Sequence, residues 1–253
     1  MKEKVAVLKA TARLAGLFYF ILGVFAYYAL MYIPKKIMVR GDTALSADNL
    51  LAHEFLYRTG IASHLISVIT FLFLALSLYK LFKQTNAEKA KLLVALVVVQ
   101  VPIVFLLETL NMTCLMILKG QVLRSLPIEQ SKDLAMLFLK IHGYGINILE
   151  VFWGLWLIPF GQLVYKSVFI PRVLGVLLII AGIGYAIDSL TFLLLPEYRS
   201  ITQTVAFILA GLGEGSIILW LLIVGVRDHL SITVISETES RRNPGIQKIT
   251  EYI

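Results

Sequence analysis

The sequence predicts an all-α fold, an integral membrane bundle of about six transmembrane helices, and three observations support this fold class. Of the 253 residues, 58% are hydrophobic and 15% are charged, whereas soluble domains are about 45–50% apolar and about 25% charged. The mean hydropathy is +0.84. Six apolar segments are also long enough to cross the hydrocarbon core of a bilayer, which takes about 20 helical residues. These segments cover residues 13–33, 60–80, 91–118, 137–164, 172–195 and 203–226.

The first segment is predicted to be an uncleaved span. Basic residues precede it, as they precede the apolar core of a signal peptide, and they are Lys2, Lys4, Lys9 and Arg13. The apolar run over 14–33 is 20 residues long, longer than the signal core of about 7–15 residues. No small-residue cleavage site follows it. We therefore expect this segment to stay in the membrane.

The other elements follow from local signals. The stretch SADNLLAHEFLYRTG in the long connection 34–59 predicts a helix that is capped by Ser46 and continues directly into the second span. Pro102 and Pro159 lie inside the third and fourth spans, where proline can break a transmembrane helix beside a cavity. Pro171 is predicted to begin the fifth helix. We expect one transmembrane domain over 1–230 and a polar cytoplasmic tail over 231–253.

The net charge of +7 is best explained by membrane topology. Lys and Arg are more frequent in the N-terminus, the connections after the second and fourth spans and the C-terminal segment than in the alternate connections. By the positive-inside rule, this bias predicts that both termini are cytoplasmic. The basic residues form no nucleic-acid-binding motif and are not interleaved with aromatic residues. We therefore expect the lipid bilayer, and no nucleic acid, as a partner.

Four acidic residues lie inside predicted spans: Glu108, Glu150, Asp188 and Glu214. An ionised side chain at the bilayer centre costs about 2.5–3.5 kcal/mol on insertion scales, so such residues usually face the interior of a bundle. Helical spacing places Glu150 on one stripe of the fourth span, together with Gly143, Asn147, Gly154 and Gly161. Small residues let helices approach closely, so this stripe is predicted to face a neighbouring helix.

Most of these polar residues fall between the middle of the membrane and its predicted outer surface. We therefore predict a pocket that opens outward and binds a small cation or a polar ligand. Its predicted lining residues are Glu108, Asn111, His142, Asn147, Glu150, Asp188 and Glu214.

Three functions fit this pattern. The first is a non-enzymatic protein that binds or conducts a small cation or polar ligand, although no inverted repeat typical of transporters is visible. The second is a metal-dependent hydrolase in which His64 and His142 join carboxylates around zinc, without an HExxH motif. The third is a structural or interaction role, with each carboxyl group hydrogen-bonded inside the bundle. We favour the first function. The sequence assigns no catalytic residue and no cofactor, and it leaves the oligomeric state open.

Three stretches carry a resemblance to a known family. They are FWGLWLIPFGQLVYKSVFIPRVLGVLLIIAGIGYAID at 152–188, AHEFLYRTGIASHLI at 52–66 and LYKLFKQTN at 78–86. With these stretches, the chain resembles the bacterial multipass membrane family called domain of unknown function 4386, from the first span to about Arg227. The resemblance implies a bacterial inner-membrane protein with several spans. It implies no activity, substrate or catalytic residue.

Overall fold

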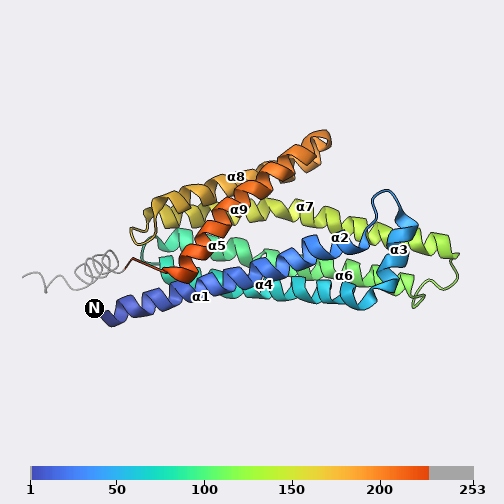
Figure 1. Cartoon of the computed structure of the whole chain (residues 1–253), viewed down its shortest axis with the longest axis horizontal. Helices are drawn as coiled ribbons and strands as arrows, with labels where there is room; N and C mark the ends of the chain where they lie inside the picture. Colours follow the sequence, from blue (N-terminus) through green and yellow to red (C-terminus); the bar gives the residue numbers. More distant parts are fainter. Residues whose placement is uncertain (1, 228–253) are drawn as a thin grey trace, which may run out of the picture.

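The structure is a computed structural model that describes residues 2–227, and every regular element in this range is a helix (Figure 1). Within the described residues, six helical stretches are long and apolar enough to cross a membrane. They are Glu3–Ile37, Glu54–Phe82, Ala87–Leu118, Ile128–Lys166, Arg172–Leu194 and Pro196–Ile223. Each of the six predicted spans overlaps one of these stretches, so the predicted fold class is confirmed. The predicted tail over 231–253 lies outside the described residues.

The first and third spans contain interruptions. The first combines α1 (Lys2–Tyr27), a π-helical turn (Tyr28–Tyr32) and α2 (Ile33–Ile37). α3 (Thr43–Ala52) lies before the second span, α4 (Glu54–Phe82), and the third span consists of α5 (Ala87–Val98) and α6 (Gln100–Leu118). The remaining elements are α7 (Ile128–Lys166), α8 (Arg172–Leu194), a 3₁₀ turn (Pro196–Tyr198) and α9 (Arg199–Ile223).

Neighbouring helices pack along one another in the order expected of a bundle. α1 packs along α4, α6 along α7, α7 along α8, and α8 along α9. At one end of the bundle, which we call the N-terminal end, α1 begins and α9 ends, whereas α3 lies at the opposite end, the α3 end (Figure 1). The hairpin of α8 and α9 diverges from α1 and α2 toward the α3 end (Figure 1).

The glycine stripe of α7 packs directly against α8. A Cβ atom added to Gly154 would collide with the carbonyl oxygen of Gly182, and one added to Gly161 would collide with that of Gly175. Small residues at both positions allow the two backbones to touch, which is how transmembrane helices gain van der Waals contact. The prediction that this stripe faces a neighbouring helix is confirmed for Gly154 and Gly161, and that helix is α8, whereas a Cβ atom added to Gly143 would meet nothing within 4 Å.

An aromatic cluster fills the bundle toward the N-terminal end. The rings of Tyr19, Phe71 and Phe160 surround Trp156, with centroid distances of 4.8–5.7 Å from the indole. Tyr19, Trp156 and Phe160 are each at most 2% exposed. Aromatic pairs at these separations contribute both buried area and favourable ring geometry. The cluster therefore closes the interior of the bundle on this side.

A helix forms where the sequence predicts one before the second span, but its predicted cap at Ser46 and its predicted continuation into that span are wrong. α3 begins at Thr43, where the side chain of Asp42 accepts a hydrogen bond from the Leu45 N–H at 2.8 Å. Ser46 instead bonds to both backbone groups of Val39, at 2.9 and 3.2 Å. At His53 the backbone leaves the helical region, with φ −116° and ψ 36°, before α4 begins. The earlier carboxylate acts as the cap because it reaches the free N–H groups of the first turn.

The prolines act differently from one another. α7 is continuous through Pro159. The third span is interrupted at Val99, three residues before Pro102, which has no N–H to donate to the carbonyl of Val98. The fifth helix begins at Arg172, with Pro171 as the residue before it, one position later than predicted. The backbone of α7 therefore tolerates its proline, whereas the third span is divided near Pro102.

Candidate functional site

A cavity of about 1260 Å³ lies inside the bundle, and we call it the central cavity. Its walls come mainly from α1, α2, α4, α6, α7 and α9, with further residues from the π-helical turn, the connection between α2 and α3, the start of α3, and α8. Tyr19, Phe71 and Trp156 of the aromatic cluster are also among its lining residues. Most of the predicted pocket residues line it, together with His64. They are Glu108, Asn111, His142, Asn147, Glu150 and Glu214.

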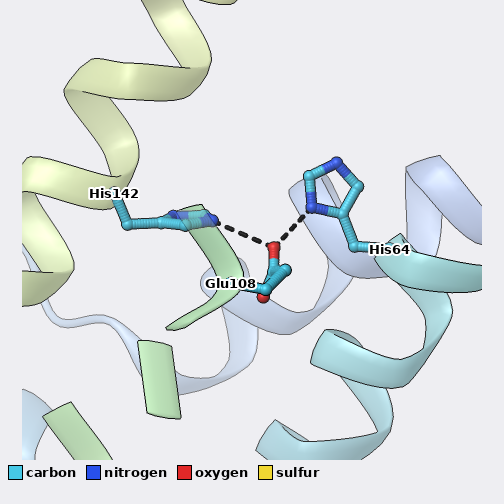
Figure 2. Close-up of side chains that lie close together, drawn as sticks. All are labelled: His64, Glu108 and His142. Atoms are coloured by element: carbon cyan, nitrogen blue, oxygen red, sulfur yellow. Dashed lines mark hydrogen bonds and ion pairs between the residues drawn. The ribbon is translucent and has the colours of Figure 1, made fainter. Parts of the chain in front are cut away.

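Three metal-ligand side chains meet at one wall of this cavity, and we call them the His–Glu–His cluster: His64 of α4, Glu108 of α6 and His142 of α7. Figure 2 shows both imidazole rings directed at the same carboxylate oxygen of Glu108. His64 Nδ1 lies 2.5 Å and His142 Nε2 lies 3.1 Å from Glu108 Oε1. The three potential ligand atoms all lie within 4.8 Å of one another. Residues far apart in the sequence therefore form one compact group.

Further hydrogen bonds hold the carboxylate of this cluster in place. Asn111 Nδ2 donates to Glu108 Oε2 at 2.8 Å, and the Tyr57 hydroxyl donates to Asn111 Oδ1 at 2.9 Å. Glu108 and His64 are 3% and 4% exposed. A buried carboxylate is stable only when its oxygens are bonded, and here both oxygens have partners. The orientation of Glu108 is thus fixed by groups on α4 and α6 as well as by the histidine on α7.

Glu214 forms a second polar group at the cavity wall. Its two carboxylate oxygens accept hydrogen bonds from the hydroxyl groups of Tyr19 on α1 and Tyr185 on α8, at 2.5 and 2.9 Å. Both oxygens are therefore satisfied by tyrosine donors. This arrangement joins three helices near the aromatic cluster, and it meets the requirement for buried polar groups without any ligand.

Asp188 differs from the prediction because it is not among the residues that line the central cavity. It is completely buried, and its Oδ1 accepts a hydrogen bond from Thr202 at 2.5 Å. The guanidinium group of Arg199 lies 3.9 Å from Oδ2 and also donates to Asn147 Oδ1 at 2.8 Å. Asp188 is directed toward α9 because α8 lies against α7 through the paired glycines. Asp188 therefore joins α8 to α9 through Oδ1, whereas its buried Oδ2 has no hydrogen-bond partner among the described residues.

Glu150 lines the central cavity, as Glu108 and Glu214 do, and also lies near the Asp188 group. It is 8% exposed, and it is near enough to Asp188 and Arg199 to interact with both electrostatically. The predicted acids thus belong to three neighbourhoods, around His64, around the tyrosines and around Arg199. They do not converge on one point.

Several partners of the predicted residues were not predicted. Tyr57, Tyr19 and Tyr185 donate hydrogen bonds to polar residues of the spans. Arg199 lies between the predicted spans 172–195 and 203–226. The sequence did contain a signal, since a tyrosine inside an apolar span needs a bonding partner when it is buried. Helical spacing, however, does not show which acid on another helix each hydroxyl reaches.

The His–Glu–His cluster has the composition of a transition-metal site. Imidazole nitrogen and carboxylate oxygen are ligands that suit zinc and other divalent transition metals, with bonds of about 2.0–2.2 Å. One ion placed among the three side chains would replace the two hydrogen bonds to Glu108 Oε1. Because all three residues also line the central cavity, a fourth ligand position would face that cavity.

The sequence matches the family described as Domain of unknown function (DUF4386) over residues 14–225. No curated protein and no solved structure matches the chain. The matched range contains all three residues of the His–Glu–His cluster and most of each membrane-spanning stretch. The chain therefore belongs to the DUF4386 family, and it has the architecture of a multipass helical membrane domain.

Proposed function

We propose that this chain is a membrane protein that binds one divalent transition-metal ion in the central cavity, through His64, Glu108 and His142. The observation that carries the proposal is the convergence of three ligand-type atoms, from three separate helices, within 4.8 Å. This function is a specific form of the cation binding that the sequence favours.

The surroundings of the cluster support metal binding over a purely structural role. Metal-binding side chains are usually oriented by further hydrogen bonds, and losing such a bond lowers metal affinity about 10–100-fold. The pair of Asn111 and Tyr57 supplies this support for Glu108. A structural cluster would also need no space beside it, whereas these three side chains line a large cavity. An ion thus has both its ligands and a route to them.

The experiment measures the metal content of the protein purified in mild detergent, followed by titration of the metal-depleted protein with Zn²⁺. We expect about one ion per chain, and a loss of binding in His64→Ala, His142→Ala and Glu108→Gln. His53→Ala is the matched control, because this exposed histidine lies outside the cluster, at the junction of α3 and α4. Zinc binding that is absent from the wild type, or unchanged in all three cluster variants, contradicts the proposal.

Metal-dependent hydrolysis is a second candidate function, and one observation favours it. Catalytic zinc sites use three protein ligands and leave a fourth position for water or substrate, and the cluster offers three ligands beside a cavity. The same zinc-loaded and metal-depleted preparations test this candidate with an amphipathic ester substrate. Product release that requires both zinc and His142 supports hydrolysis, and equal release without zinc contradicts it.

Binding fits the central cavity better than conduction does. The rings of Tyr19, Phe71 and Trp156 are packed together at the wall toward the N-terminal end, so no open path is expected to continue there.

We infer that the protein resides in a bacterial inner membrane with both termini in the cytoplasm. The distribution of Lys and Arg supports this orientation.

A further inference from the structure

The central cavity is larger than a metal ion requires. Its volume of about 1260 Å³ exceeds the roughly 300–1,000 Å³ of typical small-molecule sites. The His–Glu–His cluster occupies the wall formed by α4, α6 and α7. The walls from α1 and α9 are mainly apolar, with Leu22 and Ala26 on α1 and Phe207 and Ala210 on α9. The cavity therefore has room for a ligand with a hydrocarbon part.

The cavity opens sideways between α1 and α9. Tyr27 of α1 and Phe207 of α9 line the cavity and yet are 60% and 53% exposed, so they border an opening. Gly23 and Gly211, on the same two helices, also line it, and a Cβ atom added to either would meet nothing within 4 Å. In a membrane-spanning bundle, such an opening faces the acyl chains of the bilayer.

Within residues 2–227, the two helices are held together toward the N-terminal end, up to the hydrogen bond from Tyr19 to Glu214. There, Arg13 Nη2 donates to the carbonyl oxygen of Ile223 at 3.1 Å, and a Cβ atom on Gly16 would collide with Leu221 and Leu222. α9 then runs away from α1 toward the α3 end (Figure 1). The opening is therefore part of the helix arrangement, set by where the backbones of α1 and α9 touch.

Three basic residues line the cavity near the α3 end: Lys35 in α2, Arg40 in the connection to α3, and Lys140 in α7. All three are exposed, and none forms an ion pair with an acid among the described residues. Asp42 also lines the cavity, but its Oδ1 is used to cap α3. This part of the cavity therefore attracts an anion.

We propose that the central cavity holds one membrane lipid with an anionic phosphate headgroup. The headgroup contacts Lys35, Arg40 and Lys140, and an acyl chain enters through the opening between α1 and α9. Charge complementarity selects the headgroup, and the apolar walls accommodate the chain. This inference is independent of the metal, because it uses other residues of the same cavity.

The test uses the purified full-length protein in mixed micelles that contain brominated phosphatidylglycerol or brominated phosphatidylcholine. Bromine quenches nearby tryptophan fluorescence, and Trp153 and Trp156 both line the cavity. We expect quenching at lower concentrations of phosphatidylglycerol than of phosphatidylcholine. Changing Lys35, Arg40 and Lys140 to Gln weakens this preference by about fivefold for each charge removed. Gly211→Leu blocks the opening and reduces quenching by both lipids.

Lys36→Gln is the matched control, since Lys36 is the neighbour of Lys35 but does not line the cavity. It should keep the preference of the wild type. Equal quenching by both lipids in the wild type overturns the proposal, as does an unchanged preference in the triple Gln variant. Inorganic phosphate that displaces brominated phosphatidylglycerol at equal concentration also overturns it, because the acyl chain would then contribute nothing. The same measurement is made on metal-depleted protein. If that protein still prefers phosphatidylglycerol to phosphatidylcholine, lipid binding does not depend on the proposed metal binding.

Discussion

Glu108 shows how single residues of the spans are held in this protein. One of its carboxylate oxygens meets two imidazole nitrogens, and the other accepts a hydrogen bond from Asn111. A charged or polar group in the membrane interior is costly unless other groups satisfy it. The same donors that satisfy Glu108 also give it a defined orientation, which is what a metal ligand needs.

Tyr57 is predicted to affect zinc binding without contacting the ion. Tyr57→Phe removes the hydroxyl that holds Asn111, so Glu108 becomes less well oriented. We expect zinc affinity to fall about tenfold, while the thermal unfolding temperature changes little. Isothermal titration of the metal-depleted protein measures the affinity. Tyr144→Phe, at an exposed tyrosine of α7, is the control, and equal affinities in both variants contradict the role of Tyr57.

Asp188 shows what residue patterns leave undetermined. Its position inside an apolar span predicts correctly that it is buried. The spacing of residues along α8 does not, however, reveal that Thr202 and Arg199 of α9 lie beside it. Glu108, in contrast, does line the cavity, and two histidines on other helices bond to its carboxylate. Which acid lines the cavity depends on how helices are paired, and a single helix contains no information about its partners.

At the scale of elements, glycines on α7 and α8 bring the backbones of these two helices into direct contact. Gly154 faces Gly182, and Gly161 faces Gly175. Since lipid chains are as apolar as most side chains, close backbone contact is a main source of attraction between such helices. This contact also sets the position of Glu150 and Asn147, which lie one and two turns before Gly154 on α7.

We predict that Gly182→Ala destabilises the bundle. The new methyl group would lie 2.7 Å from the Gly154 carbonyl oxygen and 3.1 Å from the Leu157 Cβ atom. Overpacking of this kind typically costs about 1–3 kcal/mol, so the thermal unfolding temperature in detergent should fall. Gly215→Ala is the control, because its Cβ atom would meet nothing within 4 Å and alanine favours helix. A similar temperature for both variants would rule out the proposed role of this contact.

At the scale of the whole molecule, the interior changes along the bundle axis. The aromatic cluster fills it toward the N-terminal end, and the central cavity lies between this cluster and the basic residues near α3. This arrangement explains why the His–Glu–His cluster is buried and yet borders open space. The aromatic cluster therefore closes the central cavity toward the N-terminal end.

The orientation of the bundle gives a prediction for intact cells. In a Cys114→Ser background, Glu129→Cys at the start of α7 should react with a membrane-impermeant maleimide. Lys83→Cys, in the connection between α4 and α5, should react only after the membrane is made permeable. Both positions are exposed, so solvent access within the protein does not differ between them. Labelling of Lys83→Cys in intact cells would reverse the proposed topology.

The sequence by itself determined the fold class, the approximate spans and the burial of the acids, because hydropathy and span length depend only on residues close in the chain. It also indicated the face of α7 that packs against another helix. Only the tertiary structure decided that His64, Glu108 and His142 meet, that Asp188 binds Thr202 instead of lining the cavity, and that α1 and α9 diverge. These features depend on contacts between helices, and the angles and pairings of helices arise from the packing of all of them together.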